Sequence, residues 1–166
     1  MTSLPCRPRD RSGGDPQAVL DYFQTTDGVA LGRSLLAEAV AEKEESGVDL
    51  ALIVCARFAT AADIKPLLFE LAPAGWHHDH ESIVSLLGKL KSPDTVDALY
   101  HATQWIPEHL DYDESRALAG KAIWALGAIP GPEATAALTR LLDDKDESLH
   151  ERAARQLRRR ADALTT

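Results

Sequence analysis

The residues with the clearest chemical potential form one short cluster, "HHDHE", at positions 77–81. Imidazole nitrogens and carboxylate oxygens are the ligands by which proteins bind transition metals. His77 and His80 are three positions apart, so they would share one face of a helix that begins early in this stretch. With Glu81 they define a candidate metal site. The preferred interpretation is that His77, His78 and His80 are exposed loop histidines without a metal, and the metal site is the alternative.

No other arrangement of residues indicates catalysis. The sequence has neither a Ser/His/Asp nor a Cys/His combination suited to nucleophilic catalysis, and no glycine-rich loop that would hold phosphates. We therefore expect a protein that is not an enzyme and needs no cofactor. A metal-dependent enzyme centred on His77, His80 and Glu81 remains the alternative.

The elements that carry this cluster are predicted to be helices. Apolar residues make up 45% of the chain, mostly Ala and Leu, and only 5% of residues are aromatic, which favours an all-α fold. Asp15 and Pro16 are typical of a helix start, and Gly47 is interpreted as the stop of the second helix. Apolar spacing predicts helices at 16–24, 28–46, 48–59, 62–72, 80–91, 92–105, 113–129, 131–142 and 146–164.

An internal repeat organises these helices. Residues 87–99, "LGKLKSPDTVDAL", align with residues 126–138, "LGAIPGPEATAAL", and both fit the pattern L-G-x-[LI]-x-x-P-[DE]-x-x-x-A-L. The Leu and Ile positions bury one helix face, the small Gly permits close helix approach, and the Pro starts the second helix. Each copy is therefore a pair of short helices joined by a tight turn.

This repeat resembles the HEAT repeats of small bacterial proteins, including the bilin-lyase type. The stretch "LLDDKDESLHERAARQL" (141–157) adds to the resemblance. It implies a right-handed α-solenoid of about five HEAT-like helix pairs, preceded by a disordered tail at 1–14. Residues 15–46 would form the N-terminal cap of this solenoid and residues 146–164 the C-terminal capping helix.

The resemblance also implies functions. The chain is similar to short stand-alone HEAT proteins of bacteria, some of which act as immunity or adaptor proteins beside secreted toxins. Deoxyhypusine hydroxylase, a HEAT-repeat enzyme, holds a di-iron centre with four His-Glu pairs, whereas this chain has two, His80-Glu81 and His150-Glu151. The expected function is therefore a non-catalytic protein-binding module, with a metal enzyme or a structural scaffold as alternatives.

The connections between helix pairs predict where binding occurs. In a stack of HEAT-like pairs, the tight turns at 91–93 and 130–132 lie on one edge, and the connections 73–80, 106–114 and 143–147 lie on the other. The second edge gathers acids and rings, a combination typical of interfaces. The predicted contacts, including two from the helix 92–105, are Trp76, His77, His80, Glu81, Tyr100, His101, Asp111, Tyr112, Asp113 and Glu114.

Several of these residues have a structural alternative. Asp79, Asp113 and Asp146 precede helices and are suited to cap them. Trp76 is equally suited to pack beneath its loop, and Tyr100 to lie partly buried between helices.

The charge distribution favours a basic protein as the partner. The formal charge is −8, but residues 1–14 carry +2 and residues 149–166 carry +3, so residues 15–148 carry −13. An acidic body repels phosphate backbones, so no nucleic acid partner is expected. The basic run 155–160 is interpreted as the solvated face of the last helix. Lys121 is interpreted as a surface lysine with a buried stem, or as the partner of an acid in the preceding repeat.

The remaining features predict a cytoplasmic protein that does not associate with membranes. Cys6 and Cys55 do not form a disulfide framework, and Cys55 is expected in the core. The N-terminus lacks the apolar stretch of a signal peptide, and no apolar run approaches about 18 residues. The sequence indicates no particular oligomeric state.

Overall fold

The structure is a computed structural model that describes residues 15–113 and 116–164. Within these ranges every regular element is helical, which confirms the all-α prediction. The predicted tail 1–14 lies outside the described residues. The α-helices are α1 (Pro16–Tyr22), α2 (Gly28–Glu42), α3 (Glu45–Phe58), α4 (Lys65–Leu71), α5 (His80–Leu90), α6 (Val96–Gln104), α7 (Ala117–Ala128), α8 (Pro132–Arg140) and α9 (Glu147–Leu164). Three single 3-10 turns accompany them: η1 (Pro93–Thr95), η2 (Glu108–Leu110) and η3 (Leu141–Asp143).

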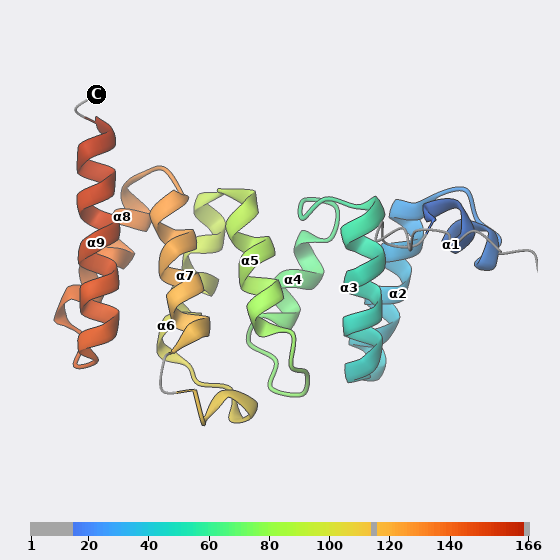
Figure 1. Cartoon of the computed structure of the whole chain (residues 1–166), viewed down its shortest axis with the longest axis horizontal. Coiled ribbons are helices and arrows are strands. Elements are labelled where there is room, and N and C mark those ends of the chain that lie inside the picture. Colours follow the sequence, from blue (N-terminus) through green and yellow to red (C-terminus); the bar gives the residue numbers. More distant parts are fainter. Residues whose placement is uncertain (1–14, 114–115, 165–166) are drawn as a thin grey trace, which may run out of the picture.

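The helices form a row that follows the order of the chain, with the N-terminal helices at one end and α9 at the other (Figure 1). Helices α3, α5, α7 and α9 lie in the nearer layer of this view, and α2, α4, α6 and α8 lie behind them. Within the layers, α7 packs against both α5 and α9, and α6 packs against α8. Consecutive helices run in alternating directions, so every connection lies at one of two edges.

Local signals explain where the helices begin and end. The Asp15 carboxylate accepts a hydrogen bond from the Gln17 amide at 3.0 Å, and Asp27 accepts one from the Ala30 amide at 2.9 Å, so both residues cap helices. The predicted stop at Gly47 is wrong. Helix α2 ends at Glu42, where Lys43 adopts a left-handed conformation with φ 53°, and Gly47 lies inside α3.

The internal repeat corresponds to two equivalent helix pairs, α5 with α6 and α7 with α8. Pro93 and Pro132 each occupy the first turn of the second element, as predicted. Gly131, with φ 100°, makes the turn before α8 in a conformation that favours glycine. The repeated Leu positions are all fully buried; they are Leu87, Leu99, Leu126 and Leu138.

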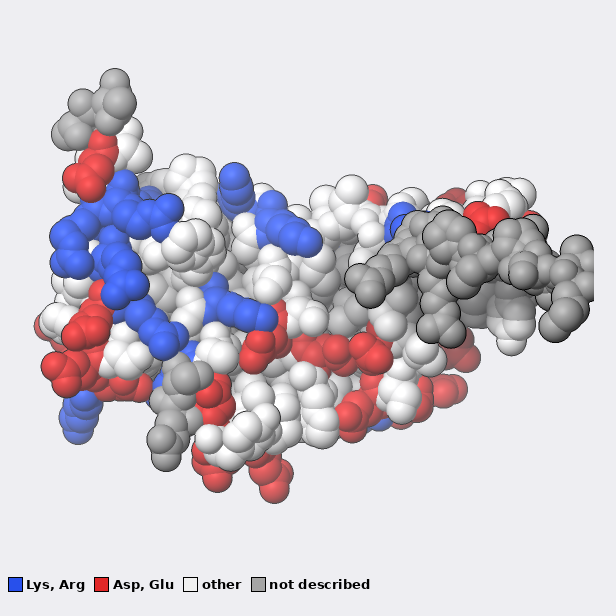
Figure 2. All heavy atoms as spheres, in the orientation of Figure 1, with Lys and Arg blue, Asp and Glu red and all other residues white. Residues whose placement is uncertain are grey.

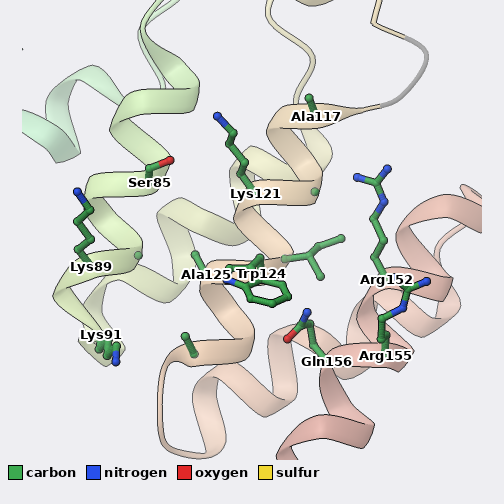
Figure 3. A pocket seen from close by; sticks show the side chains of 14 residues that line it. Ser85, Lys89, Lys91, Ala117, Lys121, Trp124, Ala125, Arg152, Arg155 and Gln156 are labelled. Carbon is green, nitrogen blue, oxygen red and sulfur yellow. The ribbon is translucent and has the colours of Figure 1, made fainter. Parts of the chain in front are cut away.

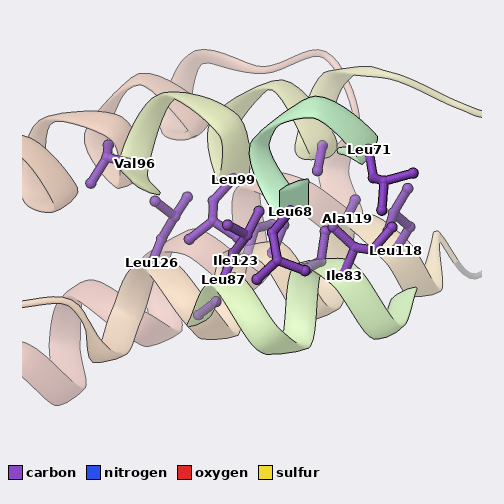
Figure 4. Packing of buried hydrophobic residues seen from close by; sticks show 14 of the residues in the cluster. Leu68, Leu71, Ile83, Leu87, Val96, Leu99, Leu118, Ala119, Ile123 and Leu126 are labelled. Carbon is purple, nitrogen blue, oxygen red and sulfur yellow. The ribbon is translucent and has the colours of Figure 1, made fainter. Parts of the chain in front are cut away.

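The core runs between the two layers (Figure 4). Leu68 and Leu71 of α4 point toward Ile83 and Leu87 of α5, and Ile123 of α7 continues this packing toward the C-terminal end. Cys55 is buried, as predicted, and burial raises the pKa of its thiol. None of the helices in the described ranges is long and apolar enough to span a membrane.

Candidate functional site

The three longer connections emerge at one edge of the row, the lower edge in Figure 1, and the tight turns after α5 and α7 lie at the other. Asp and Glu side chains gather along this lower edge (Figure 2). We call this surface the acidic edge. Its described carboxylates are Asp79, Glu81, Glu108, Asp111, Asp113, Asp143, Asp144, Asp146 and Glu147.

Some of these carboxylates have structural roles. Asp113 accepts a hydrogen bond from the Ala117 amide at 2.7 Å. Asp146 accepts one from the Ser148 amide at 3.0 Å and pairs with Arg116 at 2.9 Å. The predicted capping role is therefore confirmed for Asp113 and Asp146. Asp79 occupies the N-cap position of α5, as predicted, but its side chain makes no capping hydrogen bond, and its pKa is raised, mainly by burial.

Two further acids bond to neighbouring helices. Asp144 accepts hydrogen bonds from the Asp146 amide at 2.9 Å and from the Gln104 side chain at 3.0 Å, and the first of these does most to lower the Asp144 pKa. Glu81 pairs with Lys121 of the following repeat at 2.5 Å. Lys121 is thus the partner of an acid in the preceding repeat, one of its two predicted roles.

The remaining acids are free to meet a partner. Glu108, Asp111, Asp143 and Glu147 are exposed, and none of their carboxylates has a hydrogen-bond or ion-pair partner within residues 15–113 and 116–164. Beside them Tyr112 is 80% exposed and projects from the connection between α6 and α7. This part of the acidic edge combines unpaired carboxylates with an exposed tyrosine ring.

The predicted histidines form a different structure from the one expected. The rings of His77 and His80 stack at 4.2 Å between centroids, and His80 also stacks on His109 at 5.2 Å. His78 lies at 4.3 Å from His109 on the outer side. Trp76 and Trp105 meet His77 and His80 edge-on, at 5.2 and 4.9 Å. We call these six residues the histidine stack.

The histidine stack is largely internal. His77 and His80 are 0% and 1% exposed, so the prediction that they are exposed partner contacts is wrong, while His78 is exposed and pairs with Glu45 at 2.8 Å. Trp76 is half-buried against the core, which agrees with its packing alternative. The two buried histidines hold the connection after α4 onto the helical layers.

The hydrogen bonds of these histidines argue against the alternative of a metal site at His77, His80 and Glu81. The Nε2 atoms of His77 and His80 bond to the carbonyls of Leu71 at 2.9 Å and Ala74 at 2.8 Å, and His77 Nδ1 accepts from the Asp79 amide at 3.1 Å. Glu81 points instead to Lys121. In the part of the chain that the structure describes, no group of three His, Cys, Asp or Glu side chains is arranged to hold a metal ion. His77, His80 and Glu81 therefore do not converge on a common point.

The other predicted contacts are separated. Tyr100 is half-buried on α6, and the guanidinium of Arg140 lies 4.0 Å from its ring centre, which matches its alternative role between helices. His101 is exposed beside Trp105, with 5.7 Å between ring centroids. Glu114 lies outside the described residues.

Sequence reasoning missed His109 and Trp105 as members of the histidine stack. They lie about 30 residues beyond His77, and no spacing rule connects the two segments. The available signal was composition, because ring-bearing residues cluster in successive connections of a repeat whose connections share an edge.

Comparison with protein families matches residues 118–144 to the PBS lyase HEAT-like repeat. This stretch comprises nearly all of α7, all of α8 and the turn η3. The expected resemblance to HEAT repeats is thereby confirmed for this helix pair, which matches a HEAT-like repeat. No match was found among curated proteins or among solved structures.

Proposed function

We infer that this protein is a non-catalytic binding module that docks a basic surface of another protein on its acidic edge. HEAT-like repeats suit a scaffold or binding role, because stacked pairs present extended surfaces. The full architecture behind this proposal is a right-handed α-solenoid of about five helix pairs. In the cytoplasm, such a module would act as an immunity or adaptor protein.

The observation that carries the proposal is the part of the acidic edge around η2. Glu108 and Asp111 are exposed and unpartnered within the described chain, and Tyr112 is 80% exposed between α6 and α7. Tyrosine is among the residues most enriched at protein interfaces, and unpaired carboxylates steer a basic partner toward it.

The test uses charge reversal at residues without a structural role. Asp113 caps α7 and Glu81 pairs with Lys121, so changing either would disturb the fold. The informative variant is Glu108→Lys with Asp111→Lys. Its matched control is Glu38→Lys with Glu133→Lys, which changes the net charge equally at exposed acids on α2 and α8.

Partners are captured from the native cell on the wild-type protein, and the association rate of the captured protein is then measured across a salt series. The edge variant is expected to associate about tenfold more slowly at low salt and to lose most of the salt dependence. The control variant should bind as the wild type does. The proposal would be rejected if the edge variant associated as fast as the wild type. It would also be rejected if the captured partner were an acidic protein whose binding neither variant changed.

A further inference from the structure

A groove of about 820 Å³ crosses the nearer layer of the molecule and meets the acidic edge only at the Lys121–Glu81 pair. It lies over α7 and is flanked by α5 and α9 (Figure 3). Its floor consists of small or apolar residues of α7, among them Ala117, Ala125 and Ala128, with the indole of Trp124 in the middle. We call this surface the basic groove because of its margins.

Cationic side chains come from all three helices. Lys89 and Lys91 stand on the α5 side, Lys121 rises from α7, and Arg152 and Arg155 stand on the α9 side (Figure 3). No carboxylate is among the described residues that line the groove. In the space-filling view, Lys and Arg side chains accordingly gather over the C-terminal part of this face (Figure 2).

Part of this charge is already engaged within the fold. Lys121 pairs with Glu81, and Arg152 donates a hydrogen bond to the Arg116 carbonyl at 3.3 Å. Gly120 makes room for the Arg152 guanidinium, because a Cβ there would meet Arg152 Nη1 at 2.1 Å. These contacts join Lys121 of α7 to α5, and Arg152 of α9 to the start of α7.

The other cations are available. The side chains of Lys89, Lys91 and Arg155 have no hydrogen-bond or ion-pair partner among the residues described. Trp124 is 58% exposed, and Arg159 stacks at 4.4 Å from its ring centre, so the indole is held in place while one side stays open. An oriented, exposed Trp bordered by Lys and Arg has the composition of an interface anchor.

We propose that the basic groove docks an acidic amphipathic helix of another protein. The groove has a volume of about 820 Å³ and runs over α7 between α5 and α9, a shape that suits a helix of a few turns. The apolar stripe of such a helix would rest on the alanines and on Trp124. Its acidic flanks would meet Lys89 and Lys91 on one side and Arg155 on the other.

Charge complementarity favours a short acidic helix over a nucleic acid. A phosphate backbone gains little from an apolar floor and pairs best with cations placed along its whole path. Here the cations stand at two margins, and the acidic edge begins where Glu81 meets Lys121, so a long polyanion would be repelled as it left the groove. A helix of a few turns ends within the basic face.

The test uses a synthetic peptide of about 15 residues with Leu at helical spacing and Glu on both flanks. A second peptide has Lys in place of every Glu, and a single-stranded oligothymidine is the third probe. Binding of each labelled probe is followed by fluorescence anisotropy at low ionic strength. The protein variant is Lys89→Glu with Arg155→Glu; Lys91 is kept because it ends α5 in a left-handed conformation with φ 48°.

The matched control is Lys145→Glu with Arg158→Glu, which makes the same charge change at exposed residues outside the groove whose side chains have no partner among the residues described. The acidic peptide should bind the wild type and the control alike, and the groove variant at least about tenfold more weakly. The proposal would be overturned if the acidic peptide did not bind the wild type, or if the control variant lost as much affinity as the groove variant. It would also be overturned if the Lys peptide bound as tightly as the acidic peptide. Oligothymidine that bound more tightly than the acidic peptide, and whose binding was lost in the groove variant, would overturn it as well. None of these results depends on the acidic edge.

Discussion

The His80 ring stacks on His77 and meets Trp105 edge-on. Its Nε2 atom is hydrogen-bonded to the Ala74 carbonyl, and its Nδ1 atom is buried without a partner. His109 Nε2 is also buried and unpartnered. Burial lowers the pKa of His80 to about 4 and is also the largest cause that lowers the pKa of His109. At the residue scale, burial therefore favours the neutral form of the His80 and His109 rings.

Acid should destabilise the protein through His80. A histidine with a folded pKa of about 4 and an unfolded pKa of about 6.5 takes up its proton first in the unfolded state. Stability is then full above pH 6.5, falls as the pH drops toward 4, and is lower by up to about 3 kcal/mol below that. Urea unfolding at several pH values measures this slope.

The variant His80→Phe should flatten that slope whatever its effect on stability at neutral pH, because it removes the titrating group. His101→Gln, at an exposed histidine, should leave the slope as it is. A slope unchanged by His80→Phe would show that another group carries the acid sensitivity.

At the scale of elements, the approach of α5 to α7 depends on the repeat glycine. A Cβ at Gly88 would lie 2.7 Å from the Cβ of Ala125, closer than packed carbons come. The equivalent Gly127 faces Gln156 of α9, whose Oε1 would be 2.3 Å from an added Cβ. The conserved shape of the two repeat copies thus sets how closely consecutive pairs stack.

Substituting Gly88→Ala should destabilise the protein. Overpacking costs about 1–3 kcal/mol, and the better helix propensity of Ala offsets at most about 1 kcal/mol of that. Gly75→Ala is the control, since a Cβ there meets nothing within 4 Å, and its effect should stay within about 0.5 kcal/mol. Chemical denaturation compares the two. A Gly88→Ala variant at least as stable as the wild type would mean that the layers adjust freely.

At the scale of the whole molecule, the two charged surfaces have opposite sign and different chain origins. The acidic edge comes from connections, and the basic groove comes from the outward faces of α5, α7 and α9. A formal charge of −8 describes neither surface. The prediction of a solvated basic run at 155–160 is incomplete, because Arg159 stacks on Trp124 and Arg160 donates to the Gly131 carbonyl at 3.0 Å.

The ends and centre of the row should differ in local stability. Helix α1 buries no residue, whereas α7 buries six and packs on both neighbours of its layer. Native-state hydrogen exchange should find α1 amides exchanging fastest and α7 amides approaching the global unfolding limit. Similar protection of both helices would contradict this gradient.

The sequence by itself determined the helices, their pairing and the edge on which the connections lie. These features follow from local rules: apolar spacing buries Leu87 and Leu126 alike, and Pro93 and Pro132 start the second helices. Two alternating edges then follow from any regular stack of short pairs.

Only the tertiary structure decided which side chains of a connection turn inward. His77 is buried whereas its neighbour His78 is exposed. The carbonyls of Leu71 and Ala74 and the ring of Trp105 form a polar, aromatic environment for the buried rings of His77 and His80. The basic groove likewise could not be predicted from the order of residues in the chain. Lys89 and Arg155 lie on one surface only because α5 and α9 both pack on α7. Burial and charge density depend on neighbours in space, and those neighbours come from segments that no local pattern connects.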